Sequence, residues 1–175
     1  MRAIRPVLVA AVCLGAVAGI GGLTYLKVTG LRGQPSPGWL ETQVARTARG
    51  VAIPSGARAR TNPLAGQGVP AEGLEHFARY CAMCHANDGS GQKTAIGGGL
   101  YPKPPDLRAE ATQQLTDGEL FYIIQNGVRF TGMPAFAPTS TPEGDTLDWQ
   151  LVSFIRHLPR LTPAETEWME GLNPF

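Results

Sequence analysis

Five consecutive residues near the middle of the chain, Cys81-Ala82-Met83-Cys84-His85, constrain its fold more than any other segment. This pattern is typical of haem c attachment, because two thiols three residues apart reach the two vinyl groups and the adjacent imidazole points at the iron. A thioredoxin-like pair would need a βαβ setting, and a structural zinc site would need four ligands. The sequence offers neither, so we expect the chain to fold around one covalently bound haem.

The iron needs a second axial ligand, for which there are five candidates: Met133, Met83, Met169, His76 and His157. Met83 lies inside the attachment motif and cannot reach around the ring. Both histidines are expected at the surface, and Met169 lies among charged residues near the C-terminus. Met133 belongs to a segment, 126–136, whose Gly and Pro residues predict a loop, and it follows His85 by 48 residues. We therefore predict His85 and Met133 as the metal ligands.

An uncharged stretch of 21 residues, 6–26, follows Arg2 and Arg5. About 20 apolar residues span a bilayer as one helix, so residues 1–30 are predicted to be a signal anchor that contacts membrane lipid through 6–26. A cleaved signal peptide stays open as an alternative, because residues 16–18 read Ala-Val-Ala. The arginines favour an N-terminus in the cytoplasm.

The charges divide the chain into two parts. Residues 1–69 hold eight Lys and Arg against one Glu, whereas residues 70–175 hold seven Lys and Arg against 13 Asp and Glu. The acidic part lacks a stripe of alternating basic and aromatic residues, so no nucleic-acid partner is expected. Residues 31–70, rich in Gly and Pro, are predicted to be a linker that binds anionic lipid or an acidic partner, or is simply solvated.

Within this linker one short helix is predicted at 37–49, with Ser36 as its cap and Gly50 just after its end. Its apolar stripe is too small to fold alone, and the stripe either packs on a partner or stays mobile. Residues 51–70 are expected to be extended.

Residues 71–175 are predicted to form a compact helical domain. Residues 71–81 and 146–158 show helical spacing of apolar side chains. Thr116 and Glu119 form a capping box, and the helix that they open is expected to end near Asn126. Thr162 opens a last short helix. No segment predicts a strand, so the fold class is all-α.

Over residues 70–160 the chain resembles class I cytochromes c. Gly73, Phe77 and Cys81 lie four apart, as in the first helix of that family, and residues 132–134 match its methionine loop. Leu151 and Phe154 match the spacing of its last helix, where the two helices cross. The resemblance implies a small cytochrome c fold wrapped around one haem, preceded here by a membrane helix and a linker.

The resemblance also implies that a proline carbonyl within 100–106 accepts the proton of His85. Three prolines compete, and the candidate cofactor-binding set includes Pro104. Tyr101 and Phe136 complete this set as apolar walls of the pocket. Leu100, Tyr122 and Phe130 are further pocket candidates.

Ligation by His and Met fills both axial positions and favours a high potential, so these expectations favour a one-electron carrier rather than an enzyme. Two alternatives stay open: a five-coordinate haem sensor or enzyme, and a mainly structural docking subunit. Because haem c is attached outside the bacterial cytoplasm in the family that the chain resembles, the domain is expected to face the periplasm. The expected partners are redox proteins of a hetero-oligomeric respiratory or photosynthetic complex.

Overall fold

The computed structural model describes residues 4–30, 32–33, 36–91, 94–136 and 141–173. It divides the chain into two compact units, Met1–Gly33 and Gln34–Phe175. The first unit is essentially one helix, α1 (Ile4–Thr29). Its segment Pro6–Thr29 has a mean hydropathy of 2.2 and is long and apolar enough to cross a membrane. The helix therefore has the length and composition that a membrane anchor requires.

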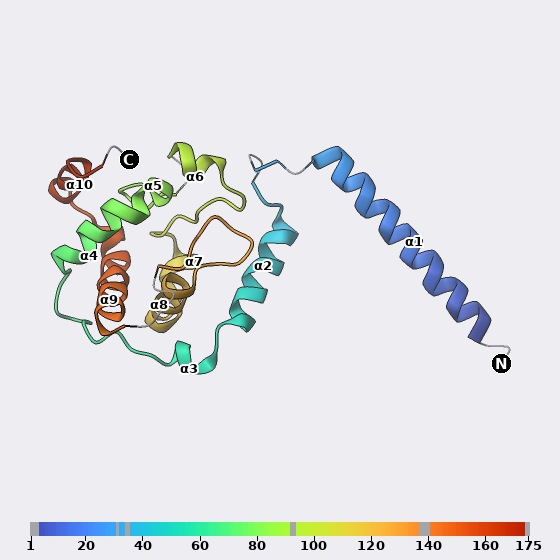
Figure 1. Cartoon of the computed structure of the whole chain (residues 1–175), viewed down its shortest axis with the longest axis horizontal. Helices are drawn as coiled ribbons and strands as arrows, with labels where there is room; N and C mark the ends of the chain where they lie inside the picture. The colour runs from blue at the N-terminus through green and yellow to red at the C-terminus, as the bar shows by residue number, and fades with distance from the viewer. Residues whose placement is uncertain (1–3, 31, 34–35, 92–93, 137–140, 174–175) are drawn as a thin grey trace. The chain divides into compact units, whose positions relative to one another are not determined.

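The second unit contains helices throughout, and its described residues include no strand. This confirms the all-α class. In chain order its elements are α2 (Trp39–Ala52), α3 (Ser55–Arg58), α4 (Ala71–His76), the π-helical turn η1 (Phe77–Cys81), α5 (Ala82–His85), α6 (Ala95–Gly99), α7 (Glu110–Gln113), α8 (Asp117–Asn126), α9 (Pro142–His157), the 3₁₀ turn η2 (Leu158–Arg160) and α10 (Pro163–Glu170). In Figure 1, α4 lies across α9, and α8 runs beside α9.

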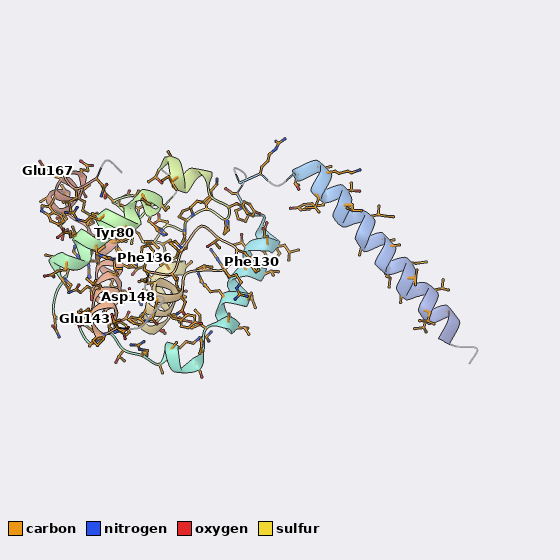
Figure 2. The ribbon with its side chains drawn as sticks, in the orientation of Figure 1. Tyr80, Phe130, Phe136, Glu143, Asp148 and Glu167 are labelled. Carbon is orange, nitrogen blue, oxygen red and sulfur yellow. The ribbon has the colours of Figure 1, made fainter. Side chains whose placement is uncertain are left out.

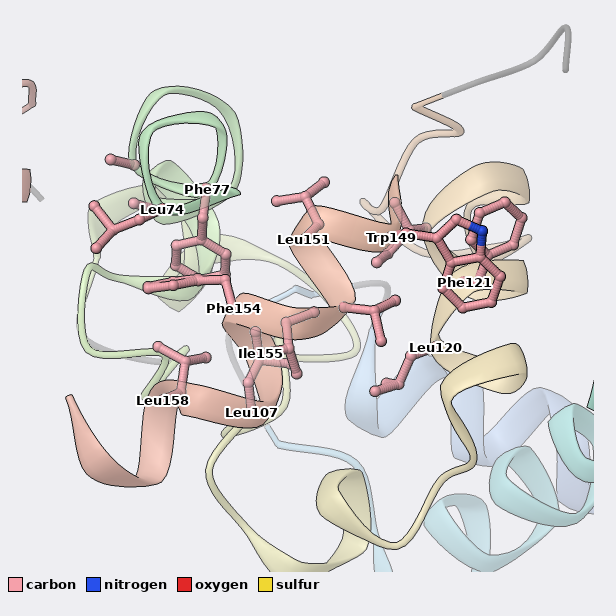
Figure 3. Packing of buried hydrophobic residues seen from close by; sticks show 14 of the residues in the cluster. Leu74, Phe77, Leu107, Leu120, Phe121, Trp149, Leu151, Phe154, Ile155 and Leu158 are labelled. Atoms are coloured by element: carbon pink, nitrogen blue, oxygen red, sulfur yellow. The ribbon is translucent and has the colours of Figure 1, made fainter. Parts of the chain in front are cut away.

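The crossing of α4 and α9 is close because Gly73 has no side chain. A Cβ atom there would lie 2.5 Å from the Gln150 carbonyl oxygen on α9. One turn further along, the rings of Phe77 and Phe154 pack with their centroids 4.9 Å apart. Figure 3 shows these two rings packed together between Leu74 and Leu151 in the buried cluster. The predicted crossing of the first and last helices is thus confirmed.

Helix ends follow local rules. Thr116 and Glu119 form the predicted capping box, and α8 ends at Asn126 before Gly127. A second capping box, from Thr162 and Glu165, opens α10. The helix predicted at 146–158 begins earlier, at Pro142, because Thr141 caps it.

The segment between the two predicted domains differs from an extended linker. Helix α2 begins at Trp39 after Gly38, rather than after Ser36, and runs through Gly50 to Ala52. Beyond it, Ile53 and Asn62 are buried in the second unit. We refer to residues 39–62 as the strap. No local pattern predicts this packing, because the strap's partners lie far away in the chain.

The strap is fixed mainly by polar contacts. The Asn62 side chain donates to Ser153 Oγ at 2.9 Å, and the Arg60 guanidinium stacks 4.0 Å from the centre of the Phe121 ring. The Thr116 hydroxyl donates to the Arg58 carbonyl at 3.1 Å. These contacts attach residues 58–62 to α8 and α9.

Candidate haem-binding site

The Cys-x-x-Cys-His motif occupies the end of the first core helix. Buried Phe77 begins the π-helical turn η1, which runs to Cys81, and α5 then carries Cys84 and His85. Wider π-helical turns often occur at functional sites. Both cysteines are free thiols and half-buried. The structure thus presents two thiols and one imidazole from a single stretch of helix.

The imidazole of His85 is held close to the segment of prolines. Its Nδ1 atom is buried and has no hydrogen-bond partner among the described residues. Burial lowers the pKa of His85, and the Pro105 carbonyl partly opposes this. The carbonyl that acts on the ring is therefore that of Pro105, the residue after the candidate Pro104.

The proline segment is positioned by a close backbone contact. Gly91, with φ of +79°, lies so close that a Cβ atom would be 2.5 Å from the Pro104 carbonyl oxygen and 2.8 Å from that of Pro105. Pro104 itself is buried. This contact brings the loop after His85 against the proline segment, and the sequence alone does not reveal it.

Charged side chains join the same two segments. The Arg108 guanidinium lies 3.2 Å from Asp88, just after the motif, and 2.8 Å from Asp106. The Asp88 carboxylate also accepts from the Ser90 amide at 2.9 Å. These contacts hold the loop after His85 against the proline segment.

A buried carboxylate lies near the first cysteine. Asp148 on α9 is buried, and its Oδ2 has no hydrogen-bond partner among the described residues. Burial, and then the charge of Asp145, raises the pKa of Asp148 to about 6. Burial, with Cys84 and Asp148, raises the pKa of the Cys81 thiol to about 12. Sequence analysis missed Asp148, although its spacing from Leu151 places it on the buried stripe of α9.

The predicted methionine loop is a hydrogen-bonded turn after α8. The Val128 amide donates to the Met133 carbonyl at 3.1 Å, and the Met133 amide donates to Thr131 Oγ1 at the same distance. The Phe136 amide donates a hydrogen bond to the Ile124 carbonyl of α8 at 3.1 Å. These bonds fix the loop at both ends and so position Met133.

The loop's side chains point in different directions. Met133 and Phe136 are partly buried against the same hydrophobic cluster that Cys81 contacts. Phe130, in contrast, has φ of +62° and is 92% exposed, so it is no wall of a pocket. Figure 2 shows Phe136 within the body of the domain and Phe130 toward its rim. Tyr101 is 37% exposed, and its hydroxyl donates to Glu41 of α2 at 2.5 Å.

The rival axial candidates have other contacts. His157 bonds the Glu165 carboxylate at 2.9 Å, and the His76 ring packs 4.6 Å from that of Tyr80. Met169 on α10 is fully buried in the hydrophobic cluster. Met83 is exposed on α5.

These residues fit haem c. Two thiols stand beside an imidazole on which the Pro105 carbonyl acts, and the Cys81 thiol contacts the hydrophobic cluster against which Met133 also packs. Cys81 and Cys84 would hold a haem through thioethers to its vinyl groups, and His85 with the sulfur of Met133 would bind its iron and leave no position open there. Among the described residues, no cluster of three His, Cys, Asp or Glu side chains suggests another metal site.

Comparison with known families agrees with this geometry. The family model described as cytochrome c oxidase, cbb3-type, subunit III matches residues 68–155. The match extends from just before α4 to Ile155 near the end of α9, and it includes the motif, the proline segment and the methionine loop. No curated protein matches the sequence.

Proposed function

Because the chain belongs to the family of cbb3-type cytochrome c oxidase subunit III, whose cytochrome c domain indicates electron transfer by haem, we propose that it is a one-electron carrier with a single covalent haem c. One Cys-x-x-Cys-His motif in the sequence supports a single haem. Bound haem supplies an Fe(III)/Fe(II) couple, whereas the protein supplies ligands, orientation and an apolar wall.

The observation that carries this proposal is that Cys81, Met133 and Phe136 all pack against the same hydrophobic cluster, while His85 follows Cys81 by four residues at the end of α5. In the proposal Cys81 and Cys84 form the thioethers, and His85 and Met133 are the axial ligands. The Pro105 carbonyl orients the His85 ring, and buried Pro104 supports it. Neither ligand has to leave when an electron moves, so little rearrangement is required.

We further propose that α1 is a single-pass anchor that places residues 34–175 outside the bacterial cytoplasmic membrane. The apolar segment Pro6–Thr29 supports the anchor, and Arg2 and Arg5 before it support a cytoplasmic N-terminus. The partners in this proposal are redox proteins of a respiratory or photosynthetic membrane complex, in keeping with the family of oxidase subunits to which the chain belongs.

The test is an absorption spectrum of the membrane-purified protein, oxidised and then reduced, with and without carbon monoxide. We expect the weak near-red band of iron–methionine ligation in the oxidised form and no reaction of the reduced form with carbon monoxide. Met133→Ala should lose the band and bind carbon monoxide. Met83→Leu, which changes the exposed methionine of the attachment motif, is the matched control and should retain wild-type behaviour.

Wild-type protein that binds carbon monoxide readily would overturn the axial assignment and favour a sensor or enzyme. If Met83→Leu lost the band and Met133→Ala kept it, Met133 would not be the axial ligand. A haem that the membrane's quinol-linked or dehydrogenase-linked chain does not reduce would favour a docking subunit instead.

A further inference from the structure

Helix α2 carries its apolar side chains on the surface. Leu40, Val44 and Val51 are 67%, 61% and 83% exposed. Spacings of four and seven residues place them on one face of the helix, which we call the α2 stripe. Trp39, at the start of the helix, is also exposed. An amphipathic helix is normally stabilised by burial of its apolar face. We therefore expect the α2 stripe to be buried against another surface.

The polar side of α2 is the side turned toward the domain. Glu41 accepts the hydrogen bond from Tyr101, and Arg49 and Thr42 are half-buried while α2 has no fully buried residue. Burial lowers the pKa of Arg49, which also feels the charge of Glu119 on α8. These contacts hold the helix so that its stripe faces away from the haem domain.

Charge and chain length indicate what covers the stripe. Between residues 27 and 60 the sequence has six Lys and Arg and one acidic residue, Glu41. Arg58 and Arg60 pair with Glu119 and Asp145 of the domain, which leaves an excess made up of Lys27, Arg32, Arg46 and Arg49. Such an excess attracts anionic lipid headgroups. Only nine residues separate the end of α1 at Thr29 from Trp39. A chain of that length reaches at most roughly 30 Å, so α2 cannot leave the neighbourhood of the end of α1.

We propose that α2 is an interfacial helix that lies along the membrane surface, with the α2 stripe in the boundary between headgroups and acyl chains and Trp39 at headgroup level. Apolar side chains on one face and cations around them are the properties of helices that bind in this way. The inference rests on the proposed anchoring by α1. It adds a second attachment, which fixes the orientation of the haem domain through the hydrogen bond that Tyr101 donates to Glu41.

The experiment uses the full-length haem-loaded chain in nanodiscs of phosphatidylcholine and phosphatidylglycerol. In a Cys13→Ser background, a nitroxide is attached at Val44→Cys in one variant and at Ala45→Cys in another. Ala45 is the matched control, since it is the next residue, is exposed, and lies between Glu41 and Arg49 on the polar side of α2 rather than on the α2 stripe. A third variant, Ile20→Cys, reports on α1. Paramagnetic resonance then compares the accessibility of each probe to oxygen, which concentrates in lipid, with that to a water-soluble nickel chelate.

We expect the probe at position 44 to favour oxygen, as the probe at position 20 does, and the probe at position 45 to favour the chelate. Adding Leu40→Gln and Val51→Gln should abolish the oxygen preference at position 44 and leave that at position 20 unchanged. Equal water exposure at 44 and 45, with lipid exposure at 20, would overturn the interfacial helix, preserve the anchor and leave the stripe to a protein partner. Water exposure at position 20 would overturn the anchor and the inference with it.

Discussion

The crossing of α4 with α9 and the strap are built on opposite principles. At the crossing, Gly73 and Phe77 bring two helices together through backbone contact and buried aromatic rings. In the strap, polar side chains such as Asn62 face the domain, while the apolar stripe of α2 is exposed. The crossing is therefore stabilised by burial within the chain, and the strap is attached by a few specific contacts that leave its apolar face available to its surroundings.

The largest effect is expected from Gly73→Ala, which breaks the crossing. The new methyl group would lie 2.5 Å from the Gln150 carbonyl oxygen and 2.8 Å from its carbon, both backbone atoms that cannot turn aside. Overpacking of this kind costs about 3 kcal/mol. Urea unfolding should show this loss, together with poor haem retention. A loss below about 1 kcal/mol would mean that the helices separate easily.

Asp148→Asn tests the crossing from its polar exception. Asp148 is a buried carboxyl group on α9, a helix whose other buried side chains are apolar. Its pKa of about 6 in the folded chain exceeds the 3.8 of a free carboxyl. The folded state therefore binds more protons than the unfolded state between about pH 4 and 6, and stability falls as pH rises through this window. We expect the substitution to raise the unfolding free energy by roughly 2–3 kcal/mol above pH 6 and to have little effect below pH 4.

The measurement is a series of urea unfolding curves from pH 4 to 7.5. Glu143→Gln, an exposed position on the same helix, is the control and should show no gain that grows with pH. A gain for Asp148→Asn that is equal at pH 4 and pH 7 would contradict an effect of ionisation.

The same contrast explains which features the sequence predicted. The capping box at Thr116 and the end of α8 follow local rules, so short segments were sufficient. The crossing of the helices at Gly73 was predictable because the family spacing includes the residues in contact. The fold as a whole, all-helical with an apolar N-terminal helix, is confirmed for these reasons.

The parts that the sequence left open depend on distant contacts. Burial of Asn62 requires Ser153, 91 residues away, so the part of the strap after residue 50 was predicted to be extended. The action of the Pro105 carbonyl on His85 joins segments 20 residues apart, and no local pattern in the sequence reveals it. The axial role of Met133 stays a prediction, although the structure brings its side chain to the same cluster as Cys81.

A smaller effect is expected from Asn62→Ala, which breaks the strap's polar attachment. The side chain donates to Ser153 and accepts from the Leu64 amide, each at 2.9 Å, and its removal breaks both bonds at half-buried partners. The cost should be about 2 kcal/mol. Gln67→Ala, whose amide bonds only the nearby Pro63 carbonyl, should cost less than about 0.5 kcal/mol. Amide exchange within 53–62 should accelerate in Asn62→Ala and not in Gln67→Ala. If both variants lost the same unfolding free energy, Asn62 would not be a specific attachment of the strap.

The smallest effect is expected from Gly50→Ala in the strap. It is the same change as Gly73→Ala at the crossing, but it should stabilise the protein rather than destabilise it. Gly50 lies within α2, and a Cβ atom there would meet nothing within 4 Å. Replacing glycine by alanine in a helix stabilises it by about 0.5–1 kcal/mol, because the unfolded chain loses freedom. Gly50→Ala should therefore slow amide exchange within 40–52 and leave the global unfolding midpoint almost unchanged, since α2 buries no residue of its own. If the global midpoint rose by the full gain, α2 would unfold together with the α4–α9 crossing, and the two regions would be one cooperative unit.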